Sequence, residues 1–442
     1  MNTYPRLWHQ PRLHVGDKWH DQTIESVDVV GSAVADVAIR PTLLQHGDTQ
    51  VLAYYDESRR LTLAERNIRT PNWGVHKIDS TLKWDSHNNI DLGFDPSGRL
   101  HIAGNMHASP LQYWSIDLQS SSTKVHRHEV LADARRERSV TYPRFLRDKD
   151  GQLLFTYRDG SSGDGDFICL RWNDETARYE RMTEHPLIDG GGGRNAYIDT
   201  NAPILGPDGA WHMLWVWRDS PDAESTHTVN YARSADFVTW SCADGSPLGH
   251  PIVDDAKTVV DPVPPGQGLI NNNVRLGFLP SGRPLAIYHK RDESGSQQIW
   301  AAAFDGAQWV RRQLTGWDYR WDFAGRGSLD FQIEIGPPAT TALGVLVHVR
   351  RDDAVEVFSV SEELSVTSLA SASSWSPLRR VPRSDGLHER MTLGRGWAPG
   401  DLGAEWFVLH TSVLDQRDQP PVEGTLDSEP LFVVGTSRSD RH

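Results

Sequence analysis

The stretch DKDGQLLFTYRD (148–159) decides the fold, because close variants of it recur along the chain. It contains an Asp-x-x-Gly turn, a short apolar and aromatic run, and a final Arg-Asp pair. The other copies are DPSGRLHIAGN (95–105), GPDGAWHMLWVWRD (206–219), LPSGRPLAIYHKRD (279–292) and, more loosely, ALGVLVHVRRDD (342–353), with further likenesses at 46–67 and 403–416. A glycine turn followed by such a run is typical of a β-hairpin, so each copy predicts a pair of strands.

The spacing of the copies predicts how many units the chain holds. Their turn glycines lie 53 to 73 residues apart, at Gly98, Gly151, Gly209, Gly282 and Gly344. No stretch has a sustained helical period or a capping box, so we expect few helices. Repeated all-β units without long linkers predict an all-β, seven-bladed β-propeller of about 60 residues per blade. We expect 1–442 to form this single domain, with the N- and C-terminal segments closing the ring. Two packed sandwiches or a solenoid are the alternatives.

Charge and composition exclude several classes of partner. The 442 residues include 59 acidic and 45 basic side chains, a net charge of −14, which gives no general attraction for nucleic acid or anionic lipid. No apolar run is long enough to span a membrane. The N-terminal stretch MNTYPRLWHQPRLHVGDKWHDQ lacks the apolar core of a signal peptide, so we expect a cytoplasmic protein. The oligomeric state stays open.

Familiar sequence motifs are few. Cys169 and Cys242 form no metal-binding or disulfide pattern, although a single disulfide between them stays possible. The chain lacks a Gly-x-Ser-x-Gly elbow, an HExxH motif, a P-loop and a dinucleotide fingerprint. Ser234, Asp236 and Trp240 resemble the Asp-box turn of other propellers, which ties a hairpin corner and says little about chemistry.

Two histidines are the first candidates for catalysis. His87 precedes one predicted strand and His107 follows its partner, 20 residues later. An antiparallel hairpin brings these two ends together, so both imidazoles should lie at one mouth of the propeller channel. Imidazole suits proton transfer near neutral pH. The competing interpretation is that these histidines only tie loops together, which we prefer for His101 inside the strand. Asn88 directly follows His87.

The next unit offers a second set of candidates. Tyr142 precedes a strand and Arg158 ends its partner, so the hairpin argument pairs them, with Arg144 nearby. Arginines recur at the ends of other repeats, including Arg218, and most such Arg-Asp pairs should only tie blade corners. The glycine string at 190–193 reads as a turn that brings Tyr197 to the channel mouth.

Carboxylates are plentiful, but their spacing singles out no pair. A glycoside hydrolase needs two carboxyl groups in different environments. The available ones are Asp85, Asp91, Asp159, Asp199 and Asp261.

Residues 25–335 resemble a family of seven-bladed, BNR-repeat-containing propellers that includes ulvan lyases and enzymes acting on rhamnose-glucuronate linkages. The resemblance is carried by WDSHNNI (84–90), GNMHASPLQYW (104–114), TYPRFL (141–146), FTYRDGSSGDGD (155–166) and NAYIDT (195–200). It implies that His87 and His107 are catalytic, that Tyr142 transfers a proton and that Arg158 binds a uronate carboxylate. Tyr197 matches a substrate-contacting tyrosine.

The function that this resemblance implies is β-elimination on an acidic oligosaccharide. We expect Tyr197, Arg144, Asn88 and Arg218 to bind the substrate. No cofactor is expected for the chemistry, although related propellers hold a structural metal ion. The alternatives are a glycoside hydrolase of the α-L-rhamnosidase kind and a non-catalytic glycan-binding propeller. Unsaturated products would identify the lyase.

Overall fold

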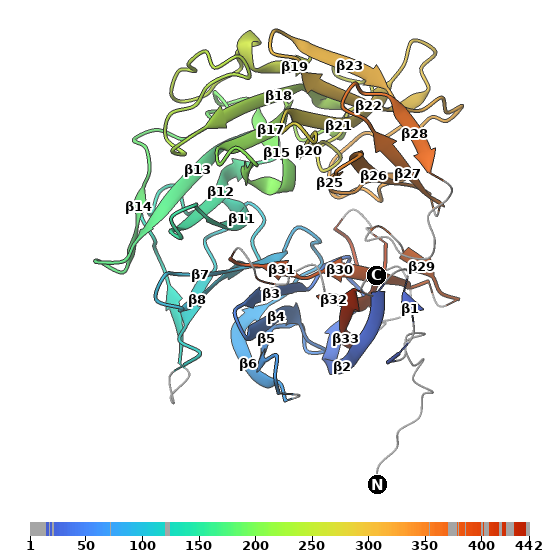
Figure 1. Ribbon diagram of the computed structural model, residues 1–442. Helices are drawn as coiled ribbons and strands as arrows, with labels where there is room; N and C mark the ends of the chain where they lie inside the picture. The colour runs from blue at the N-terminus through green and yellow to red at the C-terminus, as the bar shows by residue number, and fades with distance from the viewer. Residues whose placement is uncertain are drawn as a thin grey trace.

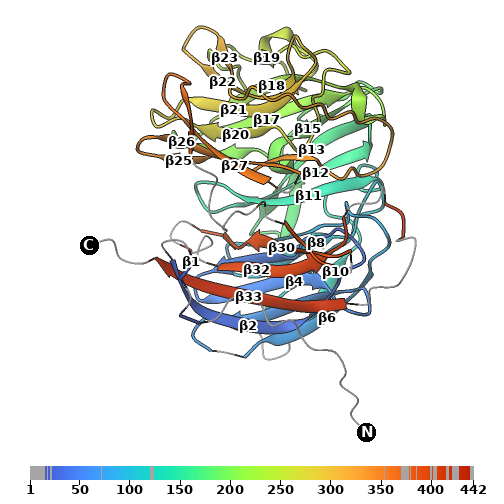
Figure 2. The same ribbon diagram turned by 90° about the vertical axis from the view of Figure 1, so that its right-hand side faces the viewer.

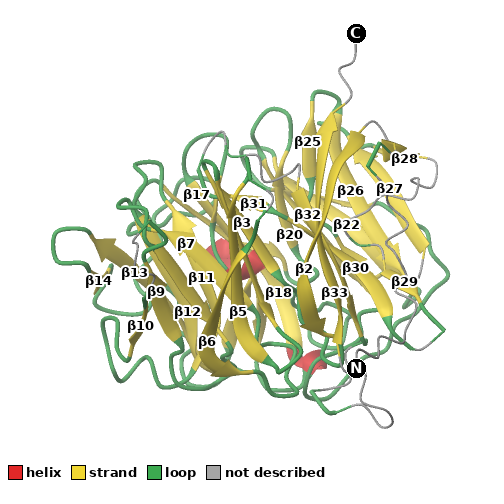
Figure 3. Ribbon diagram, turned by 90° about the horizontal axis from the view of Figure 1, so that it is seen from below, coloured by secondary structure: helices red, strands yellow, loops and turns green. Residues whose placement is uncertain are grey.

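The computed structural model arranges the chain as seven β-sheets around a central axis (Figure 1). It describes residues 15–438 apart from 17, 20–21, 71, 120–123, 353, 370–377, 379, 385, 399–400, 402–405, 415–417 and 421–427. The predicted all-β, seven-bladed propeller is confirmed. Helix within the described ranges is limited to three short 3-10 segments, Asp199–Asn201, Ala223–Ser225 and Ala256–Thr258 (Figure 3). None of the described helices is long and apolar enough to cross a membrane.

The first three blades follow the chain in order, each with its first strand innermost. The first blade comprises β3 (Thr42–His46), β4 (Thr49–Tyr55), β5 (Arg60–Asn67) and β6 (Gly74–Thr81). The second comprises β7 (Ile90–Phe94), β8 (Leu100–Gly104), β9 (Tyr113–Ile116) and β10 (Val125–His128). The third comprises β11 (Val140–Arg147), β12 (Leu153–Ser161), β13 (Asp164–Asn173) and β14 (Arg178–Arg181).

The next three blades repeat this pattern. The fourth comprises β15 (Asn195–Ile198), β16 (Ile204–Leu205), β17 (Trp211–Arg218), β18 (Thr226–Ser234) and β19 (Val259–Asp261). The fifth comprises β20 (Arg275–Phe278), β21 (Pro284–Arg291), β22 (Gln297–Phe304) and β23 (Trp309–Gln313). The sixth comprises β24 (Ile333–Ile335), β25 (Ala339–Thr341), β26 (Gly344–Arg351), β27 (Ala354–Val360) and β28 (Val366–Leu369).

The seventh blade is built from both ends of the chain. Its strands are β29 (Arg380–Pro382), β30 (His388–Leu393), β32 (Trp406–Ser412), β33 (Ser428–Arg438), β2 (Gln22–Val34) and β1 (Lys18–Trp19). β2 and β33 pair antiparallel along most of their length, so the blue and red ends of the colour scale lie side by side (Figures 1 and 2). In addition, β31 (Arg395–Gly396) pairs parallel with β3 at the inner edge of the first blade.

The sequence repeat corresponds to the turn and the second strand of a blade. In the second blade, the Asp95 carboxylate accepts the Arg99 N–H, and the Gly98 N–H bonds the Asp95 carbonyl. Gly98 adopts φ 83°, a conformation that a residue with a Cβ rarely takes, which explains the turn glycine. Asp148 and Gly151 form the same turn in the third blade. The predicted Asp-box corner is also present, with the Asp236 carboxylate accepting the N–H groups of Val238 and Thr239.

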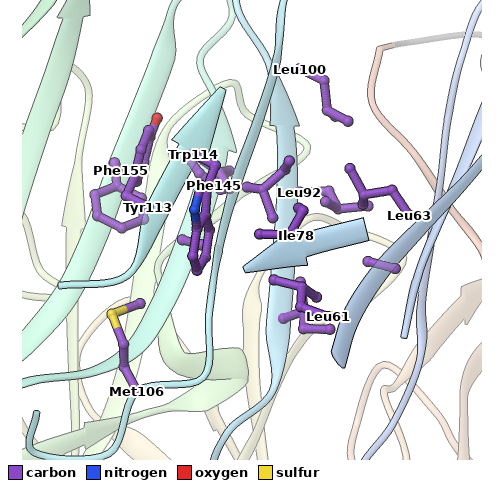
Figure 4. Packing of buried hydrophobic residues seen from close by; sticks show 14 of the residues in the cluster. Leu61, Leu63, Ile78, Leu92, Leu100, Met106, Tyr113, Trp114, Phe145 and Phe155 are labelled. Carbon is purple, nitrogen blue, oxygen red and sulfur yellow. The ribbon is translucent and has the colours of Figure 1, made fainter. Parts of the chain in front are cut away.

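The hydrophobic core lies between neighbouring sheets. One cluster joins the first three blades, with Leu61, Leu92 and Phe155 among its members (Figure 4). β8 and β17 are the second strands of their blades. Because neighbouring sheets cover both of their faces, they are buried at every position. Cys169 is buried in another such cluster, and both cysteines are free thiols.

Polar side chains on or next to the innermost strands join neighbouring blades. The Asp91 carboxylate accepts the Phe145 N–H at 2.7 Å, from the second to the third blade. Asp199 accepts the Leu276 N–H at 2.7 Å, from the fourth blade to the fifth. Asn273 accepts the Ile335 N–H at 2.9 Å. These bonds satisfy inner-strand N–H groups that have no strand neighbour on the channel side, and they fix the blades in register.

Candidate functional site

His87 and His107 stack on each other at one mouth of the channel. β7 and β8 pair antiparallel with Ile90 opposite Gly104, which is the hairpin predicted from the 20-residue spacing. The ring centroids lie 3.9 Å apart, and the ring planes differ by 22°. The structure therefore brings together the two imidazoles that the sequence singled out.

Asp85 holds both imidazoles with one carboxylate. Its Oδ1 lies 2.8 Å from Nδ1 of His87, and its Oδ2 lies 2.6 Å from Nδ1 of His107. The Oδ1 atom also accepts the His87 N–H, which closes a tight turn. No described residue bonds Nε2 of either ring, and both side chains are partly exposed. Nε2 of each imidazole therefore has no hydrogen bond among the described residues.

A second carboxylate reaches His87 from the far end of the chain. Asp418 Oδ1 lies 3.6 Å from Nδ1 of His87. The Ser328 hydroxyl lies between these partners, donating to Asp418 at 2.7 Å and lying 3.2 Å from Nδ1 of His87. Three separate segments therefore converge on one nitrogen atom.

The two carboxylates keep His87 positively charged. Burial opposes a charge on this ring, but hydrogen bonds and attraction from Asp418 and Asp85 raise the pKa of His87 to about 9. Burial also works against an ionised Asp85, yet its bonds to His107 and His87 hold its pKa far below the ordinary value. At neutral pH this cluster contains an imidazolium flanked by carboxylates.

Tyr142 reaches the site through an irregularity in β11. The β11–β12 register shifts between Thr141 and Arg144, and Tyr142 adopts φ 56°, which is rare for a residue with a side chain. The ring centroid of Tyr142 lies 6.1 Å from that of His87. Burial and the nearby Tyr197 raise the pKa of Tyr142 well above its ordinary value, so its hydroxyl keeps its proton.

Arg158 lies beneath two tyrosines. Its guanidinium carbon lies 5.1 Å from the ring centroid of Tyr142 and 5.8 Å from that of Tyr197. One nitrogen donates to Thr141 Oγ1 at 3.0 Å, and another lies 3.4 Å from the Tyr197 hydroxyl. The residue is only 4% exposed, so its guanidinium is buried beside these groups.

Tyr197 lies between two arginines. Its ring packs edge-on against Tyr142, and its hydroxyl is 2.7 Å from the Ser162 hydroxyl. Burial favours the neutral phenol, but the positive charges of Arg158 and Arg218 outweigh it and lower the pKa of Tyr197. The pKa values of Tyr142 and Tyr197 are therefore shifted in opposite directions.

The other predicted substrate residues lie at the periphery of this cluster. The three nitrogens of Arg218 bond Asp222 O, Asn271 Oδ1 and Pro221 O, although its charge still reaches the Tyr197 ring at 5.5 Å. Asn88 is buried, and its carbonyl accepts the Tyr55 hydroxyl at 2.7 Å. Arg144 lies deeper in the channel, 3.7 Å from Asp91.

The two Nδ1 atoms of this cluster are engaged by Asp85 and do not form a metal site together with it in this arrangement. Asp85, His87 and His107 have ligand atoms within 4.8 Å of one another. However, both Nδ1 atoms share protons with the Asp85 carboxylate, and a metal ligand needs a free lone pair there. Burial also raises the pKa of the Cys169 and Cys242 thiols, which disfavours the thiolate form that binds metals.

Sequence reasoning placed Asp85 among the available carboxylates but gave it no role. Its position two residues before His87 fits the turn in which an Asp carboxylate accepts the N–H two residues on, and this was a usable signal. Ser328 and Asp418 have no local signal, because each reaches His87 only through the closed ring. Thr141 and Ser162 were also missed.

The comparisons with known proteins agree with this fold. A family model described as "BNR repeat-containing family member" matches residues 49–317. The polysaccharide lyase Uly1 is 14% identical, with a TM-score of 0.63 over 92% of this chain and 91% of its own. A PL25 ulvan lyase is 13% identical, with a TM-score of 0.61 over 94% and 97%, and it has also been solved bound to -[GlcA(1-4)Rha3S]-. No curated protein matches.

Proposed function

The chain belongs to the BNR repeat-containing family, and from this membership and the geometry of the mouth we propose that it is a glycan-active enzyme, a lyase. The substrate that we propose is an acidic oligosaccharide containing a uronate, of the ulvan or rhamnose-glucuronate kind. The observation that carries the proposal is the Asp85 carboxylate that holds two stacked imidazoles beside Tyr142 and Arg158.

The reaction that this site would catalyse is β-elimination. A base removes the proton from C5 of the uronate, and the C–H electron pair becomes the C4–C5 double bond. The C4–O bond breaks, and the departing oxygen takes a proton from an acid. The carboxylate next to C5 must be neutralised, because negative charge accumulates on it in the transition state.

The local environments suggest which residue does each task. His107 shares its Nδ1 proton with Asp85, so its Nε2 offers a lone pair and is our base. Tyr142 keeps its proton because its pKa is raised, which makes it our acid. Arg158 and the charged His87 supply positive charge for the carboxylate. Tyr197, Asn88, Arg144 and Arg218 are proposed to position the sugar.

The glycoside hydrolase alternative has less support at this site. A hydrolase needs one carboxyl group that is protonated and free to act as an acid. Asp85 has a strongly lowered pKa, and both its oxygens are occupied by imidazoles. Asp91 is likewise bonded to a backbone N–H and an arginine.

A panel of acidic oligosaccharides tests the proposal. We expect products that absorb in the ultraviolet band of an unsaturated uronate and whose two fragments together weigh the same as the substrate. His87→Ala and His107→Ala should remove this activity, while His126→Ala, on the exposed strand β10, should keep it. Release of reducing sugar with added water and no absorbance identifies a hydrolase. Binding without any turnover identifies a glycan-binding protein.

A further inference from the structure

Arginines gather in the central channel, below the mouth. They come from the innermost strands of several blades, which face the middle of the ring (Figure 1), or from the strands and segments next to these. The cluster consists of Arg40, Arg144, Arg275, Arg350, Arg390 and Arg395, with the carboxylates of Asp91, Asp199 and Glu334 among them. The six named guanidinium groups thus share the three named carboxylates, in a protein whose net charge is −14. Arg380, whose charge also acts on Arg390, has its own partner in Asp330 at 2.7 Å.

The members of this cluster meet across the channel. Arg40 lies two residues before the first strand of the first blade. Its guanidinium bonds the Glu334 carboxylate of the sixth blade at 2.9 Å, although the seventh blade lies between these two blades in the ring. The charge of Arg40 also acts on Arg144 in the third blade and on Arg390 in the seventh. Groups from non-adjacent blades can interact in this way only through the space that the ring encloses.

Each of the three carboxylates already accepts hydrogen bonds from arginines or backbone N–H groups of the protein. Asp91 accepts Arg395 at 2.8 Å and the Phe145 N–H at 2.7 Å. Asp199 accepts Arg275 at 2.9 Å and a backbone N–H. Glu334 accepts Arg40 and the fully buried Arg350. Burial opposes its ionisation, yet these arginines lower the pKa of Glu334 to about 2, so it carries its full charge.

Two arginines in the cluster have no carboxylate at hydrogen-bond distance. The Arg144 guanidinium makes no hydrogen bond to any described residue, and its nearest carboxylate oxygen lies 3.7 Å away. Among the described residues, the Arg390 guanidinium donates only to the Val413 carbonyl, at 3.1 Å, and its Nε is buried without a partner. Burial, with repulsion from Arg40, lowers the pKa of Arg390 to about 10, but it stays charged. Guanidinium groups in such surroundings normally face an anion.

We propose that the central channel binds an oxyanion, held by Arg144, which lies next to Arg395 at the same Asp91 oxygen, with Arg40 at its edge. A carboxylate, sulfate or phosphate group matches the fork of the guanidinium. The source is either a free inorganic oxyanion or an acidic group of the glycan bound at the mouth. Arg144 follows Tyr142 by two residues on β11, so the site begins less than about 10 Å below the proposed catalytic tyrosine.

Calorimetric titration with sodium sulfate, at matched ionic strength against sodium chloride, measures the binding directly. We expect saturable binding of sulfate to the wild-type chain. Arg144→Gln and Arg40→Gln should each weaken it by about 10-fold or more, because each removes one charge-assisted contact. Arg127→Gln, on the outer strand β10, is the matched control and should leave it unchanged. Arg40 is 60% exposed, so its variant should fold even if the Arg144 variant does not.

Sulfate and phosphate that bind no better than chloride exclude the site. Binding that is lost in Arg158→Gln but kept in Arg144→Gln and Arg40→Gln places the anion at the catalytic mouth instead. Crystals soaked in selenate add a direct view, with an anomalous peak expected at the Arg144 guanidinium. A peak elsewhere contradicts the assignment.

A second titration separates the two sources. Acidic oligosaccharide is added to the wild-type chain with and without saturating sulfate. If the glycan places its own acidic group in the channel, sulfate weakens glycan binding, and Arg144→Gln abolishes that competition. If the ligand is a free oxyanion, glycan and sulfate bind independently. Sulfate binding needs no turnover, so its outcome stands apart from that of the proposed lyase reaction.

Discussion

The Asp418 carboxylate lies 3.6 Å from Nδ1 of His87, so a residue near the C-terminal end of the chain faces an imidazole in the second blade. It lies beyond residues 49–317, where the family model matches.

Asp418→Asn removes one of the two charges that raise the pKa of His87 to about 9. Since the proposed reaction needs the charged form of His87, activity falls as the pH rises through this value. In the variant, we expect that alkaline limb at lower pH, seen in a pH profile of kcat/KM. An unmoved limb contradicts the role given to Asp418.

The same cluster links folding stability to pH. The pKa of His87 lies above its ordinary value of 6.5, so the folded state binds its proton more tightly than the unfolded chain. The resulting stabilisation is complete below pH 6.5 and is lost as the pH rises through about 9. A shift of this size corresponds to about 3 kcal/mol. Denaturant unfolding at several pH values should show this loss in the wild type, and a much smaller one in His87→Gln.

Asp85→Asn should be the most damaging single change at the mouth. Asparagine has nearly the same shape, but it removes the negative charge and can accept only one of the two imidazole protons. The orientation of His107 and the charge of His87 are both lost. We expect kcat to fall by about 10²-fold or more, while glycan binding changes far less. Kinetics on an acidic oligosaccharide, with circular dichroism to establish folding, measure this. A variant with wild-type kcat would exclude Asp85 as the orienting group.

Tyr142→Phe tests the proposed acid. The change removes only the hydroxyl, so the leaving oxygen loses its proton donor, and we expect kcat to fall by about 10²–10⁴-fold. Tyr157→Phe is the matched control, because Tyr157 is fully buried on the neighbouring strand β12 and contributes nothing to the mouth. Equal activity of the two variants would rule out Tyr142 as the acid.

Asn273→Ala should loosen the contact between the fifth and sixth blades. The fully buried Asn273 accepts the Ile335 N–H at 2.9 Å and donates to the Ile333 carbonyl at 2.6 Å. Alanine leaves both backbone groups without a partner, so we expect a loss of about 2–3 kcal/mol in the free energy of unfolding. The exposed Asn72→Ala should cost less than about 0.5 kcal/mol. Equal unfolding midpoints for the two variants would show that this bond adds little.

The sequence by itself determined the repeat and the hairpins. Each glycine turn and the apolar run after it are local features, so the seven-bladed ring and the meeting of His87 with His107 followed from spacing alone. The pairing of Tyr142 with Arg158 followed in the same way, although the bulge that turns Tyr142 toward the mouth did not.

Only the tertiary structure decided the electrostatics. Asp418 and Ser328 reach His87, and Arg40 reaches Glu334, across segments that are far apart along the chain. No local pattern marks such contacts, because they exist only once strands from both ends of the chain have closed the ring. A pKa depends on the charges and the solvent around a group, and closure fixes both. The sequence therefore named the imidazoles, and the closed ring determined that His87 carries a charge.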